Sequence, residues 1–340
     1  MTFAANLCRF VRCAAIAAFL GAGALAAASP AAAQTAGQGI TETTRERPTY
    51  GLTNTNDQAL LQALKGRVTI PDQKAATLIQ PQGRDWRATM NGTVRSVGSW
   101  LILGIVAILI AFFLLRGTIK VEHGLSGRTV QRFNVFERFT HWFTASAFII
   151  LALTGLNVSF GRYVLLPLLG PDIFSAVSLG FKYAHNYVAF AFMIGLAVMF
   201  VIWVAHNIPN RYDAQWLAAA GGLFSRGVHP PARKFNAGQK LVFWSVIVGG
   251  TVLSVSGIYL LFPFYFGGIE TQQLATVVHS VVALVLIAVI IAHIYIGTLG
   301  MEGAWDAMNT GRVDENWARE HHSLWHAELK GQPAPKYGHD

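Results

Sequence analysis

Five long apolar segments dominate the pattern of hydrophobic and polar positions from residue 97 onward. They span about residues 97–115, 139–160, 183–205, 240–262 and 276–299. Each can cross the ~30 Å hydrocarbon core of a bilayer as a helix of about 20 residues. Backbone polar groups cannot stay unpaired in lipid, and these segments are continuously apolar rather than alternating. The pattern therefore predicts five membrane-spanning helices and not a strand barrel.

The first 33 residues have the pattern of a secretory signal peptide. Arg9 and Arg12 precede an apolar run, and Ala31 and Ala33 supply the small residues of a cleavage site before Gln34. We therefore expect residues 1–33 to be a signal peptide. An uncleaved membrane anchor is the alternative.

Both cysteines of the chain, Cys8 and Cys13, lie within this first segment. If the segment is removed, the mature chain has no thiol. It then cannot hold an iron–sulfur cluster through its own side chains, attach a c-type haem or form a disulfide.

Residues 34–96 differ in composition from the rest of the chain. They are polar and contain too few large apolar residues for an independent core. We expect an exported arm, partly extended, that becomes ordered against another surface.

The overall composition agrees with a membrane protein. Hydrophobic residues make up 53% of the chain and charged residues only 13%, whereas soluble domains carry about 25% charged residues. This excludes an ordinary soluble enzyme, a coiled coil and a disordered chain. The net charge of +9 does not indicate nucleic-acid binding, because the Lys and Arg residues cluster at the ends of apolar runs. There they suit the anionic headgroups of membrane lipids.

The distribution of Lys and Arg among the loops predicts the orientation. The loop 116–138 and the segment 206–240 each carry five basic residues, whereas 161–182 carries two and 263–275 none. Loops rich in Lys and Arg stay in the cytoplasm, so we expect the arm to be periplasmic and the tail 300–340 to be cytoplasmic. The arm itself carries eight basic residues, which strains this rule unless the signal peptide decides the orientation.

Four histidines lie inside the apolar segments: His141, His185, His279 and His293. His279 and His293 are 14 residues apart, which is a rise of about 21 Å and nearly four turns, so both lie on one face of their helix. The depths pair His185 with His279 on the outer side and His141 with His293 on the inner side. Two bis-imidazole sites stacked across a bilayer are what two b-type haems need, and filled axial positions favour electron transfer.

Other interpretations of the histidines remain open. A zinc or di-iron site would need ligands at one depth, with carboxylates. A haem-free membrane anchor would use the histidines only for packing. Small residues near the candidate ligands would let a flat macrocycle approach or would pack helices together: Thr154, Gly155, Gly195, Ser256 and Gly257. We interpret the histidines outside the crossings as solvated or interface residues: His206, His229, His321, His322 and His326.

Several short elements resemble the cytochrome b (gamma) subunit of respiratory formate dehydrogenase over roughly residues 130–327. The element from Asn236 to Lys240 is the most specific, because histidine pairs are common to membrane b cytochromes. The matching elements are Glu137-Arg138-Phe139-Thr140-His141-Trp142, Tyr183-Ala184-His185-Asn186, His206-Asn207-Ile208-Pro209, Lys234-Phe235-Asn236-Ala237-Gly238-Gln239-Lys240, His279, His293, and Trp317-Ala318-Arg319-Glu320-His321-His322.

The resemblance implies a fold and a set of cofactors. The fold would be an all-α integral membrane protein, with a four-helix di-haem cytochrome b bundle over 139–299 and one additional helix at 97–115. His185 and His279 would ligate the outer haem b, and His141 and His293 the inner one. Asn236 and Gly238 match positions that line a quinone beside the inner haem, and His293 would couple that quinone to the haem.

The element around Asn236 also has a simpler reading. Asn is a favoured N-cap residue, so Asn236 could merely start a helix, and the two roles are compatible. The quinone would be menaquinone or ubiquinone.

The resemblance further implies partners and a location in the bacterial inner membrane. A molybdenum or tungsten subunit would oxidise formate, and an iron–sulfur subunit would pass electrons to the outer haem. Quinone reduction near the cytoplasmic side would then contribute to the proton motive force. The chain itself would carry no formate-oxidising residues. The cytochrome b subunit of a nickel–iron hydrogenase or of a thiosulfate reductase is the alternative.

Overall fold

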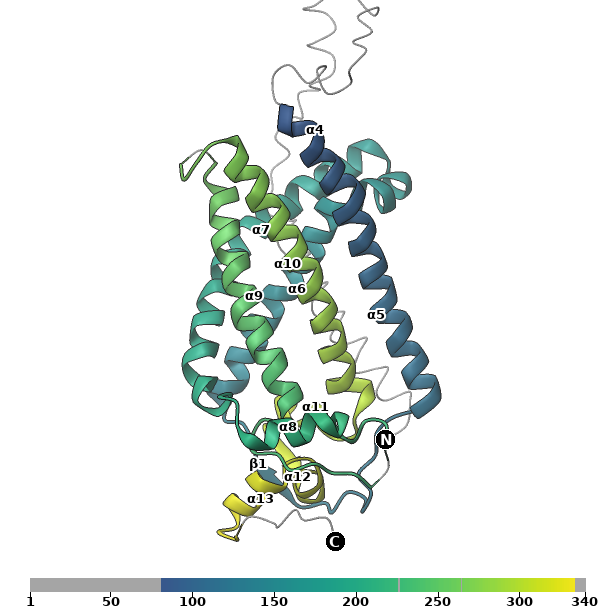
Figure 1. Cartoon of the computed structure of the whole chain (residues 1–340), viewed down its shortest axis with the longest axis vertical. Helices are drawn as coiled ribbons and strands as arrows, with labels where there is room; N and C mark the ends of the chain where they lie inside the picture. Colours follow the sequence, from purple (N-terminus) through teal and green to yellow (C-terminus); the bar gives the residue numbers. More distant parts are fainter. Residues whose placement is uncertain (1–80, 226, 264, 334–340) are drawn as a thin grey trace, which may run out of the picture.

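The computed structural model describes residues 81–225, 227–263 and 265–333. The expected signal peptide and the expected arm up to residue 80 lie outside this part. Among the described residues, five helices are long and apolar enough to cross a membrane, which is the number expected from the sequence. They form an elongated bundle with smaller helices gathered at one end (Figure 1).

The five long helices extend beyond the apolar runs, because helical hydrogen bonding continues through their polar ends. They are α5 (Arg95–Arg116), α6 (Val135–Val164), α7 (Leu166–Trp203), α9 (Ala237–Leu261) and α10 (Ile269–Tyr295). The largest difference is in α7, which begins well before residue 183. Its first turn is kinked at Gly170, whose positive φ of 74° suits glycine, and Pro171 follows directly.

The end of the expected arm is helical and continuous with the first crossing. Helix α4 (Pro81–Ala88) passes through a π-helical turn, η1 (Thr89–Val94), into α5. The indole nitrogen of Trp86 donates to the carbonyl of Gln273 at 3.2 Å, which attaches α4 to the start of α10. The expected boundary at residue 96 therefore falls inside a helix rather than at the end of an extended segment.

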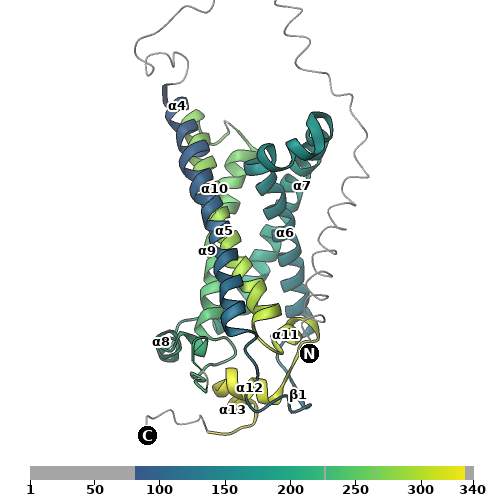
Figure 2. The ribbon, with the colours of Figure 1, turned by 90° about the vertical axis from the view of Figure 1, so that its right-hand side faces the viewer.

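Helix α5 lies beside α10, the helix that carries two of the four candidate histidines (Figure 2). Gly98 allows this contact, because a Cβ atom there would overlap the side chain of Leu284 on α10. Large apolar side chains elsewhere on α5 are exposed, among them Trp100 and Leu115. This exposure suits a helix with one face on protein and the other on lipid.

The other four crossings form two helical hairpins, α6 with α7 and α9 with α10, which meet through α7 and α9. Asparagine side chains begin α6 and α9. Asn134 accepts from the backbone N–H of Glu137 at 2.9 Å, and Asn236 accepts from that of Gln239 at 2.9 Å. In both helices, the side chain of Glu137 or Gln239 in turn accepts from the backbone N–H of the asparagine, which completes a capping box.

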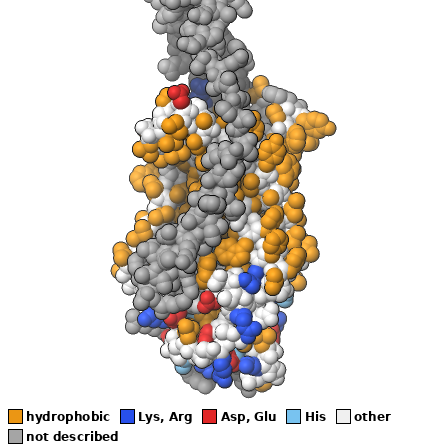
Figure 3. Space-filling model, turned by 180° about the vertical axis from the view of Figure 1, so that it is seen from behind, with side chains coloured by type: hydrophobic (Ala, Val, Ile, Leu, Met, Phe, Trp, Pro, Cys, Tyr) orange, Lys and Arg blue, Asp and Glu red, His pale blue; other side chains and the backbone are white. Residues whose placement is uncertain are grey.

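A folded cap closes one end of the bundle, where most of the visible charged side chains gather (Figure 3). We define the cap as the described residues of segments 117–133, 207–236 and 301–333. Its elements are the strands β1 (Thr129–Gln131) and β2 (Arg312–Asp314), which pair antiparallel, and four helices, α8 (Arg211–Ala218), α11 (Ala304–Asn309), α12 (Glu315–His321) and α13 (Ser323–Leu329).

Two short turns join the cap to the bundle, the 3₁₀ turn η2 (Val204–His206) and the π-helical turn η4 (Ile296–Gly300). A further 3₁₀ turn, η3 (Ala220–Gly222), lies within the cap. The segment from residue 301 to 333 is not a loose tail, because Val313, Trp317 and Ala318 are almost completely buried. The cap therefore has an apolar core made from three separate parts of the chain.

Substitution of Gly98 by Leu should separate α5 from α10. The added side chain would overlap Leu284, and overpacking of this kind costs about 1–3 kcal/mol. Gly104→Leu is the matched control, because nothing lies within 4 Å of a Cβ atom at Gly104. Thermal unfolding in one detergent should show a lower transition temperature for Gly98→Leu only. Equal transition temperatures for the two variants would contradict this packing.

Candidate functional site

The outer histidines, His185 on α7 and His279 on α10, face each other with ring centroids 6.2 Å apart and ring planes at 63°. Each Nδ1 atom lies beside a hydroxyl from a neighbouring helix. His185 Nδ1 is 2.8 Å from Thr154 Oγ1, and His279 Nδ1 is 3.0 Å from Ser256 Oγ. The structure thus brings together the pair that the sequence assigned to one depth.

These two hydroxyls determine which ring nitrogen carries the proton. Thr154 Oγ1 donates to the carbonyl of Ile150 at 2.8 Å, and Ser256 Oγ donates to that of Val252 at 2.7 Å. Their hydrogens are therefore used, and each oxygen accepts from the Nδ1–H of its histidine. Nε2 of both rings then keeps a free lone pair, which is the form that binds a metal. Sequence reasoning noted Thr154 and Ser256 only as small residues.

The inner histidines, His141 on α6 and His293 on α10, repeat this arrangement. Their ring centroids are also 6.2 Å apart, with an angle of 63°. Nδ1 of His141 is buried and has no hydrogen-bond partner among the described residues. The second predicted pair is therefore also side by side in space, toward the cap end of the bundle.

The spacing of both pairs matches two imidazoles on opposite sides of one metal ion. A metal–imidazole bond is ~2.0–2.1 Å long and the ring centroid lies ~1.1 Å further, so two rings would be separated by about 6.2–6.4 Å. No group of three or more His, Cys, Asp or Glu residues within the described part of the chain could hold a metal ion. A metal ion between the rings of either pair would therefore need its remaining ligands from a bound group, as a porphyrin provides.

The small residues near the rings have two different functions. A Cβ atom at Gly155 would lie 3.5 Å from Cε1 of His185, and one at Gly257 would lie 3.4 Å from Cε1 of His279. These glycines therefore pack directly on the imidazoles. Gly195 instead packs against Thr144 on α6, so it serves helix packing.

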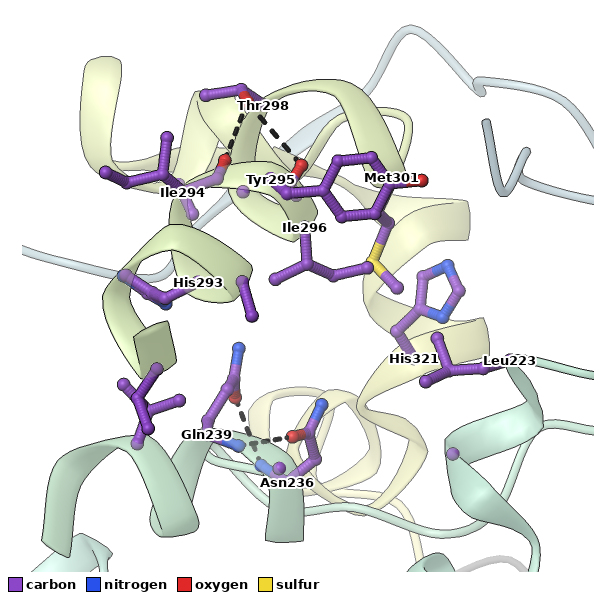
Figure 4. A pocket seen from close by; sticks show the side chains of 18 of the residues that line it. Leu223, Asn236, Gln239, His293, Ile294, Tyr295, Ile296, Thr298, Met301 and His321 are labelled. Atoms are coloured by element: carbon purple, nitrogen blue, oxygen red, sulfur yellow. Dashed lines mark hydrogen bonds between the residues drawn. The ribbon is translucent and has the colours of Figure 1, made fainter. Parts of the chain in front are cut away.

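A cavity of about 1090 Å³ extends from the inner pair to the cap, and His141, His293, Asn236 and Gly238 all lie on its wall. Its volume is at the upper end of the range for ligand pockets, roughly 300–1,000 Å³. Most of its wall is apolar, with a few polar side chains on the cap side (Figure 4). Such a cavity suits large, flat, mainly apolar ligands.

Asn236 can serve both as a helix cap and as a ligand-binding residue. Its Oδ1 atom accepts from the backbone N–H of Gln239 at the start of α9, and Oε1 of Gln239 accepts from the backbone N–H of Asn236 at 3.1 Å. In Figure 4 the amide nitrogens of both side chains point into the cavity. The two readings of the sequence are therefore compatible. Gln239, which sequence reasoning did not place in the site, presents a second amide donor.

Gly238 is required by an aromatic side chain in the cavity wall. A Cβ atom there would lie 2.7 Å from the ring of Trp216, and one at Gly221 would overlap the same ring. Trp216 lines the cavity between these glycines. Gly238 thus shapes the wall through Trp216.

Other residues of the matching elements are structural. Glu137 Oε1 accepts from Lys234 Nζ at 2.7 Å and from the indole of Trp203 at 3.0 Å. Lys240 Nζ is buried and donates to Asp213 at 2.9 Å. Asn207 is fully buried and donates to the carbonyl of Trp203. These contacts hold the ends of α6, α7 and α9 to the cap.

The interpretation of the histidines outside the crossings as solvated or interface residues is wrong for His322. Its side chain is 0% exposed, and Nδ1 lies 2.6 Å from the carbonyl oxygen of Arg233. His206, by contrast, is exposed. His321 lines the cavity, and its Nε2 atom is buried without a partner among the described residues. Burial lowers the pKa of His321 to about 4 and holds that of His322 well below its usual range.

Arg132 is a buried cation on the cap side of the cavity. Burial lowers its pKa to about 9, and no carboxylate of the described residues forms an ion pair with it. One nitrogen donates to the carbonyl of Lys234 at 2.7 Å, while Nε and Nη1 have no partner. The guanidinium also lies over the ring of Trp317. Two unpaired donors of one cation make this place suitable for an anionic group.

A family model described as prokaryotic cytochrome b561 matches residues 132–311, which is more than half of the chain. The chain belongs to this family. Membership implies haem b, and together with the five apolar helices it makes the chain a multi-pass membrane protein. The haem b that the family implies is a group of the kind that two facing imidazoles could hold.

Known relatives resemble this chain over about three fifths of its length. It is 28% identical over 213 residues to the cytochrome b556(Fdn) subunit of the nitrate-inducible formate dehydrogenase of Escherichia coli strain K12, covering 62% of this chain and 95% of the relative. It is 31% identical over 205 residues to the formate dehydrogenase cytochrome b556(fdo) subunit of the same strain, covering 59% and 94%. A formate dehydrogenase cytochrome b556 subunit of Haemophilus influenzae is 28% identical over 198 residues, covering 56% and 79%. These matches confirm the resemblance found from the sequence.

Acid should loosen the cap. His321 and His322 are buried in neutral form with lowered pKa values, so the unfolded cap binds protons that the folded cap does not. Their contribution is complete above pH ~6.5 and falls as the pH drops toward 4, by at most about 1.4 kcal/mol per pH unit for each histidine.

Hydrogen exchange of the peptide 312–329, corrected for the intrinsic chemical rate, should reveal this loss. Protection should decrease between pH 6.5 and 4, and His322→Gln should reduce the dependence on pH. Constant protection over this range in the unsubstituted chain would contradict the neutral burial of these histidines.

Proposed function

We propose that this chain is the membrane cytochrome b subunit of a formate dehydrogenase complex. Two b haems would carry electrons through it to a quinone. The two histidine pairs with one geometry are the observation that supports this most directly. The relatives named as formate dehydrogenase cytochrome b556 subunits support the identity of the complex.

The four histidines are proposed as axial ligands. His185 and His279 hold the outer haem b, and their Nδ1–H groups donate to the hydroxyl oxygens of Thr154 and Ser256. His141 and His293 hold the inner one. Haem iron accepts and releases one electron at a time, and two axial imidazoles leave no open position for oxygen chemistry. The residues therefore favour electron transfer over catalysis at the iron.

Arg132 supports haem binding on the cap side. A haem carries two propionates, and the orphan nitrogens of this buried guanidinium need an anion. We assign Arg132 to the propionate side of the inner haem. This assignment satisfies a cation that otherwise has no carboxylate partner among the described residues.

The remainder of the inner cavity is proposed to hold the head of menaquinone or ubiquinone. Asn236 and Gln239 offer amide N–H groups to a quinone carbonyl, and Gly238 with Trp216 shapes the wall. His293 lies on the same wall, so the acceptor and the inner ligand share one space. This closeness lets electrons pass from the inner site to the quinone.

The orientation follows from the basic residues of the cap. We place the cap in the cytoplasm of a bacterial inner membrane and α4 on the periplasmic side, with the signal peptide 1–33 removed. An iron–sulfur subunit and a catalytic molybdenum or tungsten subunit then dock near α4 and the outer haem. Each charge moved against 100 mV costs about 2.3 kcal/mol, so inward electron flow with cytoplasmic proton uptake stores energy.

The alternative donors are a nickel–iron hydrogenase or a thiosulfate-reductase complex. The relatives favour formate dehydrogenase. Metal analysis of the complex purified from its native membrane separates formate dehydrogenase from the hydrogenase, because nickel in a co-purifying subunit would overturn the proposal. Formate-dependent haem reduction in the same preparation separates it from a thiosulfate-reductase complex, which formate would not reduce.

The purified chain should contain two b haems per polypeptide. His279→Ala should remove one haem and leave the other, because the two sites share no ligand. A pyridine haemochrome assay measures the content, and His206→Ala, which changes an exposed histidine, should keep both haems. Retention of two haems in His279→Ala would refute the assignment of the ligands.

Substitution of Thr154 by Val should raise the midpoint potential of one haem only. Val removes the acceptor for Nδ1–H of His185, so the ring becomes a weaker donor to the oxidised iron. A tenfold change in relative affinity for the two oxidation states corresponds to ~59 mV, and we expect a shift of up to that order. Optical redox titration measures both haems. Thr251→Val, which loses only a bond to its own helix, serves as the control, and equal potentials in the two variants would contradict the role of Thr154.

A further inference from the structure

Three titratable side chains follow one another along the cap side of the cavity wall. They are Glu122 in the segment after α5, His229 in the segment before α9, and His321 at the end of α12. The side chain of Glu122 is 39% exposed and that of His229 is 25% exposed, whereas Nε2 of His321 is buried. This row therefore runs along the wall from a carboxylate that reaches solvent to a buried imidazole nitrogen.

Consecutive members of this row are close enough to exchange protons. Glu122 Oε2 lies 3.1 Å from His229 Nε2, within ion-pair distance but without the alignment of a hydrogen bond. The rings of His229 and His321 have centroids 5.8 Å apart, a separation that one bridging water molecule can span. Nε2 of His321 is buried and has no partner among the described residues. The inner end of the row therefore presents an unused imidazole nitrogen.

His321 and the candidate quinone site share the cavity. Figure 4 shows His321 beside Met301 and Leu223, across this space from His293, with the amide of Asn236 below. All of these residues lie on the cavity wall. A proton on His321 therefore faces the space in which the quinone is proposed to bind.

We propose that Glu122, His229 and His321 carry protons from the cytoplasmic surface to the quinone in the cavity. This inference rests on the proposed function, because it requires quinone reduction in this cavity. Complete reduction of one quinone consumes two electrons and two protons. The electrons come through the inner haem, and both protons bind the quinone oxygens. His321 passes each proton inward and receives its replacement through His229 from Glu122.

The charges around His321 keep it neutral at rest. His229 and Arg132 disfavour an added positive charge, and Glu320 and Glu122 favour it, but burial has the largest effect. Burial also keeps the adjacent His322 neutral. A neutral imidazole can take a proton on one nitrogen while it releases one from the other. Proton transfer through His321 therefore requires no lasting charge beside the inner haem.

Glu320 is the positioning residue of this row. It accepts the backbone N–H groups of Glu122 at 2.9 Å and of His123 at 3.1 Å, and it pairs with the ring of His123 at 2.7 Å. Burial alone would raise the pKa of Glu320, but these hydrogen bonds hold it below its usual value. Glu320 fixes the turn that places Glu122 against His229.

A purely structural role is the alternative for these residues, so the test needs a readout beyond stability. The haem-loaded chain in lipid nanodiscs is mixed with menadiol or decylubiquinol, and haem reduction is followed by stopped flow. In this direction quinol oxidation releases protons through the same row. His321→Ala should lower the maximal rate at least tenfold, with the dependence on quinol concentration unchanged.

Chemical rescue separates proton transfer from structure. Added imidazole should restore the rate of His321→Ala, because it can occupy the emptied space and carry the proton. The unsubstituted chain receives the same imidazole, which controls for binding to haem. His326→Ala is the matched variant, because His326 is also largely buried in the cap but does not line the cavity.

The outer member of the row is tested in the same assay. Glu122→Gln should slow reduction severalfold and change its solvent deuterium isotope effect. Glu315→Gln, which alters a carboxylate of the cap away from the cavity, should leave both unchanged. Haem content of every variant is measured first, and His321→Gln replaces His321→Ala if the latter loses haem.

The outcomes are distinct. Slow haem reduction in His321→Ala that imidazole restores supports the relay. The relay would be overturned if His321→Ala reduced its haems as fast as the unsubstituted chain. It would also be overturned if His321→Ala and His326→Ala were equally slow and imidazole did not restore the rate. If quinol fails to reduce the haems of the unsubstituted chain, the proposed function itself is wrong and the relay is rejected with it.

Discussion

Helix α10 carries two imidazoles inside an apolar bundle, and the arrangement of the other helices depends on satisfying them. A buried ring nitrogen without a partner is costly where no water can replace it. His279 faces an imidazole from α7 and His293 faces one from α6, with the same distance and angle, so one group bound between the rings of each pair would satisfy both. The neighbours of α10 are therefore determined by chemistry as well as by packing.

The crossings and the histidine pairs could be predicted from the sequence, because both depend on local periodicity. Apolar length determines the number of helices, and the spacing of His279 and His293 determines which depth each occupies. The contribution of Thr154 and Ser256 could not be predicted. A hydroxyl in an apolar helix usually bonds to its own backbone, and only the positions of neighbouring helices show that its oxygen also accepts from a histidine.

The cap could not be derived in the same way, because its core combines segments that are far apart in the sequence. Strand β1 pairs with β2 nearly two hundred residues later, and His322 reaches the carbonyl of Arg233. Polar composition in such segments is typical of solvated loops. Burial of His322 and of Arg132 follows from this long-range pairing, which is why the sequence pattern predicted a solvated or interface histidine at position 322, where the structure has a buried one.

Helix α5 has a consequence for exchange with the lipid phase. It contributes Leu101, Ile105 and Phe112 to the wall of the cavity, while Leu103 and Leu115 on its surface are exposed. One face of this helix therefore borders the proposed quinone site and another borders the membrane, while packing on α10 at Gly98 keeps it in place. Loss of that packing would change the width of the proposed site without altering any of its polar side chains.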